Sequence, residues 1–266
     1  MIYYDEYKQY YIIFVLLFAL IIFYLIYTYN NNKLDDDYKL DYIKFNDILD
    51  FNNMYKKQKP EHQYQHLIGH IYTNKGYILM SMDPTIKKEL VYFWNNFKHN
   101  KVNESKIEYI YNNNNKNANI TNVLYLQKYN INLFNRVNDH IKQLLINWTK
   151  KNDIEHTSTY GLREYTNNSV LVSHIDRGYT HILSAIINIY SDKSWPLIVY
   201  DHNNNMDTIN MTDKDDLVLY ESATIFHGRP IPFRGNSFVN LFIHFKTNDW
   251  IEVENSIKEK FNLGKL

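Results

Sequence analysis

The chain has 266 residues, its 29 lysines and arginines balance 29 aspartates and glutamates, and it contains no cysteine. Without cysteine, disulfides, thiolate nucleophiles and cysteine-ligated zinc sites are excluded, so a bound metal must be held by histidine or carboxylate side chains. The net charge of zero gives no global field that would attract nucleic acid, and we expect no nucleic-acid partner. The length is sufficient for one folded domain with its own core and an extension.

The amino-terminal segment is strongly apolar. Residues 10–27 contain no charge, are numerous enough to cross a bilayer as an α-helix, and have tyrosines clustered at both ends. A cleaved signal peptide is disfavoured, because Asp5 and Glu6 precede the run and no small-residue cleavage site follows it. The sequence therefore predicts a transmembrane anchor in residues 1–30, a single-pass membrane protein of open orientation, and the membrane as a partner.

A linker and a helical region are expected next. Residues 31–60 are polar and weakly periodic, which is typical of a stalk or linker. Within residues 61–156, apolar side chains recur at helical spacing in 84–99 and 131–148, which predicts two amphipathic helices in a supporting region. Between them, the Asn-rich run 112–119 predicts a mobile loop.

From residue 157 the pattern changes to short β-type runs separated by Asn, Asp, Gly and Pro. Strands of this kind after a helical layer predict an antiparallel jelly-roll barrel in 157–250, followed by a tail at 251–266. No βαβ alternation or glycine-rich phosphate loop occurs, which disfavours dinucleotide-binding and P-loop folds. The expected fold class is mainly β with supporting helices (α+β). The expected strands are 157–165, 170–176, 181–190, 196–201, 206–211, 216–221, 223–227 and 236–246.

A histidine and an aspartate stand two residues apart in the segment VLVSHIDRG. On a strand, His174 and Asp176 would point to the same face. A third candidate ligand, His227, follows 51 residues after Asp176, at the end of another β-like run. Two imidazoles and one carboxylate on one face of an octahedral iron leave neighbouring positions open, as oxygen activation requires. A His-x-Asp pair alone is a weak signal, but its β-rich context and the later histidine favour a metal site.

Five segments carry a further signal: GLREYTNNSVLVSHIDRG, HILSAIINI, WPLIVYDH, DKDDLVLYESATIFHGRPIPFRG and NSFVNLFIHF. Together, over residues 160–246, they resemble the prolyl 4-hydroxylase-like branch of the 2-oxoglutarate/iron(II) dioxygenases. The resemblance implies that His174, Asp176 and His227 bind Fe(II), and that Tyr165 contacts the co-substrate. It also implies a double-stranded β-helix core and hydroxylation coupled to decarboxylation of 2-oxoglutarate to succinate. The cofactors implied are Fe(II), with 2-oxoglutarate and O2 as co-substrates, and ascorbate as an optional cofactor.

The sequence departs from that family at one position. Prolyl and lysyl hydroxylases carry a basic residue ten positions after the distal histidine, where it pairs with the far carboxylate of 2-oxoglutarate, and this chain has Ser237 there. A buried carboxylate still needs a cation, because an unpaired buried charge is costly. Arg163, Arg229 and Arg234 are the candidates, since a guanidinium binds carboxylate through two bonds. We prefer Arg163 and Arg229.

Several other polar residues receive simpler interpretations. Ser184 is expected to approach the co-substrate, from its place on the strand after the His-x-Asp pair. Asp201, His202 and His244 lie in family-like segments and are interpreted as structural. Three histidines that recur every four residues are interpreted as surface or packing residues of one helix: His62, His66 and His70.

The sequence as a whole predicts a 2-oxoglutarate-dependent oxidoreductase, a dioxygenase that hydroxylates a side chain of a protein or peptide, with proline favoured. Lysyl or small-molecule hydroxylation on the same core is the first alternative, because the site does not distinguish these substrates. The second alternative is a catalytically inactive, membrane-tethered binding barrel. The complete His/Asp/His set argues against inactivity, whereas the absence of a basic residue at position 237 keeps that alternative open.

Overall fold

The protein is seen in a computed structural model that describes residues 51–69, 71–104, 109–114 and 121–252, together with Asn255 and Glu259. These residues belong to one of the two compact units into which the chain divides, Ile48–Leu266. The predicted anchor and most of the predicted linker, the Asn-rich loop and the predicted tail lie outside the described residues.

The predicted membrane location requires a correction. In the described part of the chain, no helix is both long and apolar enough to cross a membrane. The helix of greatest length there, α7, has 19 residues, but Arg136, Asp139 and Lys142 interrupt its apolar positions. A spanning helix needs about 20 predominantly apolar residues, so α7 fits a globular surface instead. The apolar run at residues 10–27, on which the prediction rested, lies outside the described residues.

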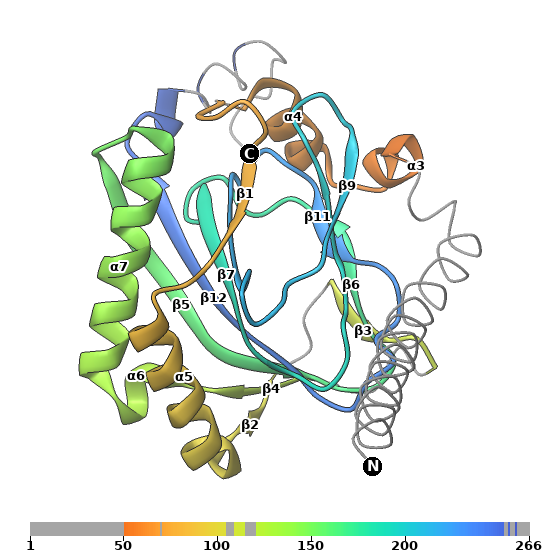
Figure 1. The fold of residues 1–266 in the computed structure, drawn as a ribbon. Helices are drawn as coiled ribbons and strands as arrows, with labels where there is room; N and C mark the ends of the chain where they lie inside the picture. The colour runs from red at the N-terminus through yellow and green to blue at the C-terminus, as the bar shows by residue number, and fades with distance from the viewer. Residues whose placement is uncertain are drawn as a thin grey trace, which may run out of the picture. The chain divides into compact units, whose positions relative to one another are not determined.

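Twelve described strands form two antiparallel sheets (Figure 1). The seven-stranded sheet has the order β1-β10-β7-β12-β5-β4-β2, and the five-stranded sheet has the order β3-β6-β11-β8-β9. This confirms the predicted class, mainly β with supporting helices. The strands are β1 Tyr77–Met80, β2 Val102–Asn103, β3 Ile110–Asn112, β4 Thr121–Leu124, β5 Ile154–Tyr165, β6 Ser169–His174, β7 Leu183–Ser191, β8 Leu197–Tyr200, β9 Met206–Ile209, β10 Leu217–Tyr220, β11 His227–Arg229 and β12 Phe238–Thr247.

Both predicted helices are confirmed, and local capping explains where they begin. The Asp83 side chain accepts hydrogen bonds from the first-turn amides of α5, and Asn130 caps α7 by accepting from the Leu133 amide. Proline at the first position of α5 needs no hydrogen-bond partner there. The described helices are α3 Phe51–Lys56, α4 Pro60–Ile68, α5 Pro84–Phe97, α6 Leu126–Tyr129 and α7 Ile131–Thr149, with the 3₁₀ turn η1 Lys98–Asn100.

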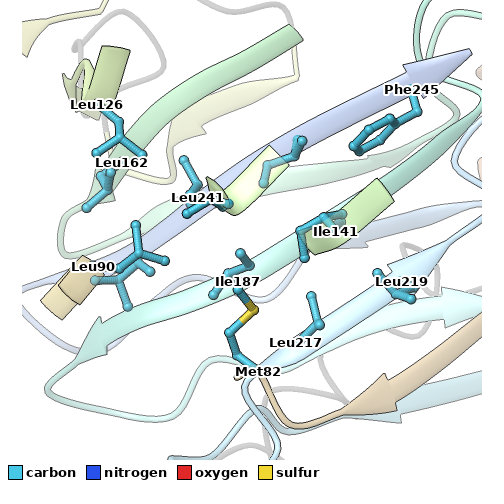
Figure 2. Packing of buried hydrophobic residues seen from close by; sticks show 14 of the residues in the cluster. Met82, Leu90, Leu126, Ile141, Leu162, Ile187, Leu217, Leu219, Leu241 and Phe245 are labelled. Carbon is cyan, nitrogen blue, oxygen red and sulfur yellow. The ribbon is translucent and has the colours of Figure 1, made fainter. Parts of the chain in front are cut away.

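The hydrophobic core lies between helices α5, α6 and α7 and one face of the seven-stranded sheet (Figure 2). Leu162, Ile187 and Leu241 come from three adjacent strands, and Leu90 and Ile141 come from α5 and α7. All five are fully buried, and replacing such a leucine by alanine typically costs about 2–5 kcal/mol of stability.

The opposite face of the same sheet carries several buried polar side chains. Because side chains alternate along a strand, the neighbours of these core residues must point away from the helices. Arg163, Ser184, Asn240 and His244 occupy such positions, and each is buried. A buried polar face turned away from the helical layer marks the place for a functional site.

Candidate metal centre

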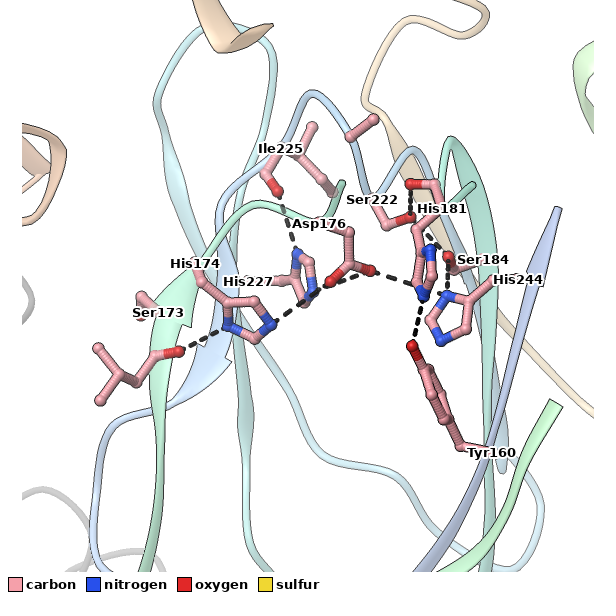
Figure 3. Close-up of polar contacts among 12 residues, drawn as sticks. Tyr160, Ser173, His174, Asp176, His181, Ser184, Ser222, Ile225, His227 and His244 are labelled. Atoms are coloured by element: carbon pink, nitrogen blue, oxygen red, sulfur yellow. Dashed lines mark hydrogen bonds and ion pairs between the residues drawn. The ribbon is translucent and has the colours of Figure 1, made fainter. Parts of the chain in front are cut away.

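The three predicted ligands converge although two of them lie far apart in the sequence. His174 ends β6, Asp176 follows two residues later, and antiparallel pairing of β6 with β11 sets His227 directly opposite His174. His174 Nε2 is 3.5 Å from Asp176 Oδ1, and His227 Nε2 is 3.8 Å from Asp176 Oδ2 (Figure 3). One donor atom from each residue lies within 4.8 Å of the others, close enough to hold one metal ion.

Hydrogen bonds show that Nδ1 of each imidazole carries a hydrogen. Nδ1 of His174 lies 2.7 Å from the Val172 carbonyl oxygen, and Nδ1 of His227 lies 3.1 Å from that of Ile225. A carbonyl oxygen can only accept, so each Nδ1 carries the hydrogen and donates it. In the neutral ring, Nε2 then keeps its lone pair on the side that faces Asp176. Burial lowers the pKa of His227 to about 4, which keeps this ring neutral and able to bind a metal at pH 7.

The Asp176 carboxylate completes a donor set that suits a cation. Its Oδ2 atom is buried and has no hydrogen-bond partner among the described residues. Gln65 of α4 holds the backbone behind it, because its amide donates to the carbonyl oxygens of Asp176 and Ala223 at 2.7 and 2.8 Å. Two imidazoles and a buried unpartnered carboxylate oxygen fit a divalent metal.

The approach of β11 to β6 depends on Gly228. A Cβ atom there would lie 2.7 Å from the Ser173 backbone, closer than real Cβ contacts allow. We expect Gly228→Ala to displace His227 from His174, to reduce metal affinity and to lower the free energy of unfolding by about 1–3 kcal/mol. Thermal melts with and without metal measure both effects. Ser173→Ala, which removes one atom from the facing residue, should leave both unchanged, and equal behaviour of the two variants would contradict this role.

Arg163, the first candidate for the co-substrate carboxylate, is engaged by an acidic residue. Its Nε and one terminal nitrogen donate to the two carboxylate oxygens of Glu104 at 2.7 and 2.6 Å. Its guanidinium also lies over the ring of Phe242, 5.2 Å from the ring centre. This bidentate, largely buried ion pair is electrically neutral as a unit.

Arg229, the second candidate, is deeper and has different surroundings. It is 1% exposed, donates to the Trp195 carbonyl oxygen, and lies over the Phe238 ring at 4.6 Å from its centre. Tyr165 contacts the same indole, with the Tyr165 and Trp195 ring centres 5.1 Å apart. The Tyr165 hydroxyl is buried and has no hydrogen-bond partner in the described part of the chain. The Arg229 guanidinium and the Tyr165 ring thus border one tryptophan, while the Tyr165 hydroxyl interacts with the Arg163 side chain.

Arg234, Ser237 and Ser184 differ from one another in their surroundings. Arg234 is exposed on the turn before β12. The Ser237 hydroxyl donates to Glu164 at 2.7 Å. Glu164 and Tyr165 are neighbours on β5 and point to opposite faces of the sheet, and Glu164 points to the face that packs against the helices. Ser237 therefore lies on that face as well. Ser184 is buried near Asp176, within a chain of hydrogen bonds to Ser222 and His244.

Three residues near the site had no recognised signal in the sequence. Gln65 and Glu104 come from outside the β-rich segment, and nothing local marks them as partners of Asp176 and Arg163. Tyr109 stacks on His174 with ring centres 4.5 Å apart, again across two distant segments. His244 was interpreted from the sequence as structural, and strand alternation in NLFIHF puts it on the same face as Asn240.

No family profile and no curated protein matches this sequence. Among solved structures, the chain is similar to a prolyl-4-hydroxylase from Pseudomonas putida, with 12% identity and a TM-score of 0.52 over 65% of this chain and 94% of that chain. The chain has the fold of a prolyl 4-hydroxylase. The resemblance seen in the sequence is thereby confirmed for the fold, a jelly-roll core of the 2-oxoglutarate-dependent dioxygenases with supporting helices.

Two further similar structures have TM-scores of 0.48. One is a Trichoplax adhaerens prolyl hydroxylase in complex with a peptide fragment of hypoxia inducible factor, at 11% identity over 74% of this chain and 98% of that chain. The other is HygX from Streptomyces hygroscopicus with nickel and 2-oxoglutarate bound, at 12% identity over 72% of this chain and 88% of that chain.

Proposed function

We propose that this protein is an oxidoreductase that uses Fe(II) and 2-oxoglutarate, with His174, Asp176 and His227 as the iron ligands. The observation that carries the proposal is the convergence of two Nε2 lone pairs and one carboxylate within 4.8 Å. Two histidines and one carboxylate are the donor set of non-haem Fe(II) oxygenases, whose metal, when bound, supplies oxygen activation. We also propose that residues 157–250 form the catalytic core and that 61–156 support it.

The chain itself would bind and orient the co-substrate. We propose Arg229 as the partner of the far carboxylate of 2-oxoglutarate, with Tyr165 donating a neutral hydrogen bond beside it. Arg163 is less suitable, because Glu104 already neutralises it. The charges then balance: Fe(II) and Arg229 together carry three positive charges, and Asp176 and the 2-oxoglutarate dianion carry three negative ones. Balance matters in a buried site, where an unpaired charge is costly.

We propose a protein or peptide substrate, with a proline side chain favoured. Support comes from the resemblance in residues 160–246 and from the fold shared with a bacterial prolyl-4-hydroxylase. The face of the seven-stranded sheet that points away from the helices would position the substrate. The aromatic side chains around that face would exclude water from the reacting centre.

A turnover experiment tests this function. The full chain is incubated with Fe(II), 2-oxoglutarate and O2, alone and with matched peptides that differ only in proline or lysine at one position. We expect succinate release that proline peptides stimulate, together with the mass of one added oxygen on the peptide. Stimulation by lysine peptides or small molecules alone would favour the first alternative. Absence of succinate under all conditions would reject the oxygenase and favour an inactive binding barrel.

A further inference from the structure

The helices α3 and α4 precede all the described strands and lie outside the residues that resemble the dioxygenases (Figure 1). Aromatic side chains pack them on the five-stranded sheet. The ring centre of Phe51 lies 5.7 Å from that of Tyr200 on β8, and the ring centre of His66 lies 4.9 Å from that of Phe226, next to β11. The α3–α4 segment, residues 51–69, is thus docked on the sheet that contains β6 and β11.

Gln65 of α4 joins two backbone segments, one that contains Asp176 and one that leads to His227. Its amide nitrogen donates to the Asp176 carbonyl oxygen at 2.7 Å and to the Ala223 carbonyl oxygen at 2.8 Å. Both hydrogens of the amide are thereby used, one for each segment. Gln65 is 8% exposed, so water does not readily replace these hydrogen bonds if the amide is removed.

Two other donors of the α3–α4 segment bind backbone near the proposed ligands. The Gln58 amide donates to the Ser173 carbonyl oxygen at 3.1 Å, one residue before the first ligand. Nδ1 of His66 lies 2.6 Å from the Thr224 carbonyl oxygen and donates to it, because a carbonyl can only accept. The α3–α4 segment therefore binds the backbone at, or within three residues of, each proposed ligand.

Strand pairing does not position the backbone that Gln65 binds. Asp176 lies two residues beyond the end of β6, and Ala223 lies in the turn between β10 and β11. One backbone hydrogen bond joins the two segments directly, from the Asp176 amide to the Ser222 carbonyl oxygen at 2.9 Å. Gln65 adds two hydrogen bonds from a third element. Because segments outside strands open more readily than strands do, the separation of these two depends on such bonds.

We propose that Gln65 is a positioning residue of the metal site, which holds the Asp176 segment and the segment that leads to His227 at the separation that one metal ion requires. This inference rests on the proposed iron site and deepens it, because the site then depends on a helix outside the β-rich core. Coupling between two sites is reciprocal, so metal binding should in turn hold α4 more firmly on the sheet.

A pair of glutamine substitutions on one helix tests the positioning role. Gln65→Met removes both donors and keeps a side chain of similar length. Gln63→Met is the matched control, because the Gln63 amide donates at 2.9 Å to the Gln58 carbonyl oxygen, within the α3–α4 segment. Cobalt(II) is the probe in equilibrium titrations of the full chain, since its visible spectrum reports the geometry of its ligands.

We expect Gln65→Met to bind cobalt about tenfold more weakly than the wild type, with an altered spectrum. Gln63→Met should keep the wild-type affinity and spectrum. A residue that only stabilises the fold would lower the melting temperature of the metal-free protein, but below that temperature the affinity and the spectrum would not change. Wild-type affinity and spectrum in Gln65→Met would therefore overturn the positioning role.

Hydrogen exchange of the wild-type chain gives an answer even if Gln65→Met does not fold. We expect cobalt to slow exchange of the α4 amides, whereas the amides of α5, which packs in the hydrophobic core, should keep their rates. Slower exchange around the ligands with no change in α4 would contradict the inference. If the wild type binds no cobalt, the metal site itself is refuted and this role with it, an outcome distinct from cobalt binding without a response in α4.

Discussion

Asp176→Ala is expected to abolish 2-oxoglutarate turnover and to reduce Fe(II) affinity by at least about 100-fold, more than the loss of a residue behind a ligand. The metal-free variant should be as thermally stable as the wild type, or more stable. The reason is that Oδ2 of Asp176 is buried and has no hydrogen-bond partner among the described residues, and such a carboxylate costs free energy in the folded state. His174→Ala should lose turnover in the same way.

Succinate assays and thermal melts with and without Fe(II) measure both effects. The wild-type protein should melt at a higher temperature with Fe(II), because a metal that binds only the folded state stabilises it. Asp176→Ala should show no such shift. Asp207→Ala is a suitable control, since Asp207 is an aspartate of β9 bonded to Tyr77 rather than to the site. Turnover by Asp176→Ala with iron present would remove the proposed ligand set.

Arg229→Gln is expected to raise the KM for 2-oxoglutarate about 10–100-fold while Fe(II) affinity stays unchanged. A charge-assisted hydrogen bond contributes about 1.5–3 kcal/mol, which corresponds to that range. Tyr165→Phe should raise KM less, because it removes one neutral hydrogen bond. Initial rates of succinate formation at varied 2-oxoglutarate measure both constants.

Three control variants separate Arg229 from the other arginines. Arg234→Gln should have no effect, since Arg234 is exposed. Arg163→Gln combined with Glu104→Gln removes a neutral ion pair without leaving either charge unpaired, and it should change KM less than Arg229→Gln does. Arg229 is fully buried, so Arg229→Lys, which keeps the positive charge, is the control for loss of folding. A KM that depends on Arg163 and not on Arg229 would reverse the assignment.

Local patterns predicted most of the secondary structure. Apolar spacing indicated the helices at α5 and α7, and alternating runs indicated the positions of β5 to β10 and β12. The sheet order was not predictable, because β12 lies between β5 and β7 through pairings that no local pattern encodes. Likewise, β1 joins the sheet by pairing with β10, far along the chain.

For the candidate site too, the sequence indicated some residues, whereas the choice among others required the fold. His174 and Asp176 share a strand end, and the resemblance adds His227. Choosing among the arginines required the fold, since their environments are set by contacts with distant residues. Glu104, the residue after β2, neutralises Arg163, a contact that only the folded chain brings about.

The most direct test of the iron and 2-oxoglutarate site is an oxygen-free equilibrium titration of the full chain with Fe(II) and then with 2-oxoglutarate. We expect a single Fe(II) per chain, and 2-oxoglutarate binding that is much tighter after the metal has bound. This order is expected because the co-substrate would coordinate the metal through its 2-oxo and adjacent carboxylate oxygens, in addition to its contact with Arg229. Absence of stoichiometric Fe(II), or 2-oxoglutarate affinity that is the same with and without metal, would contradict the account.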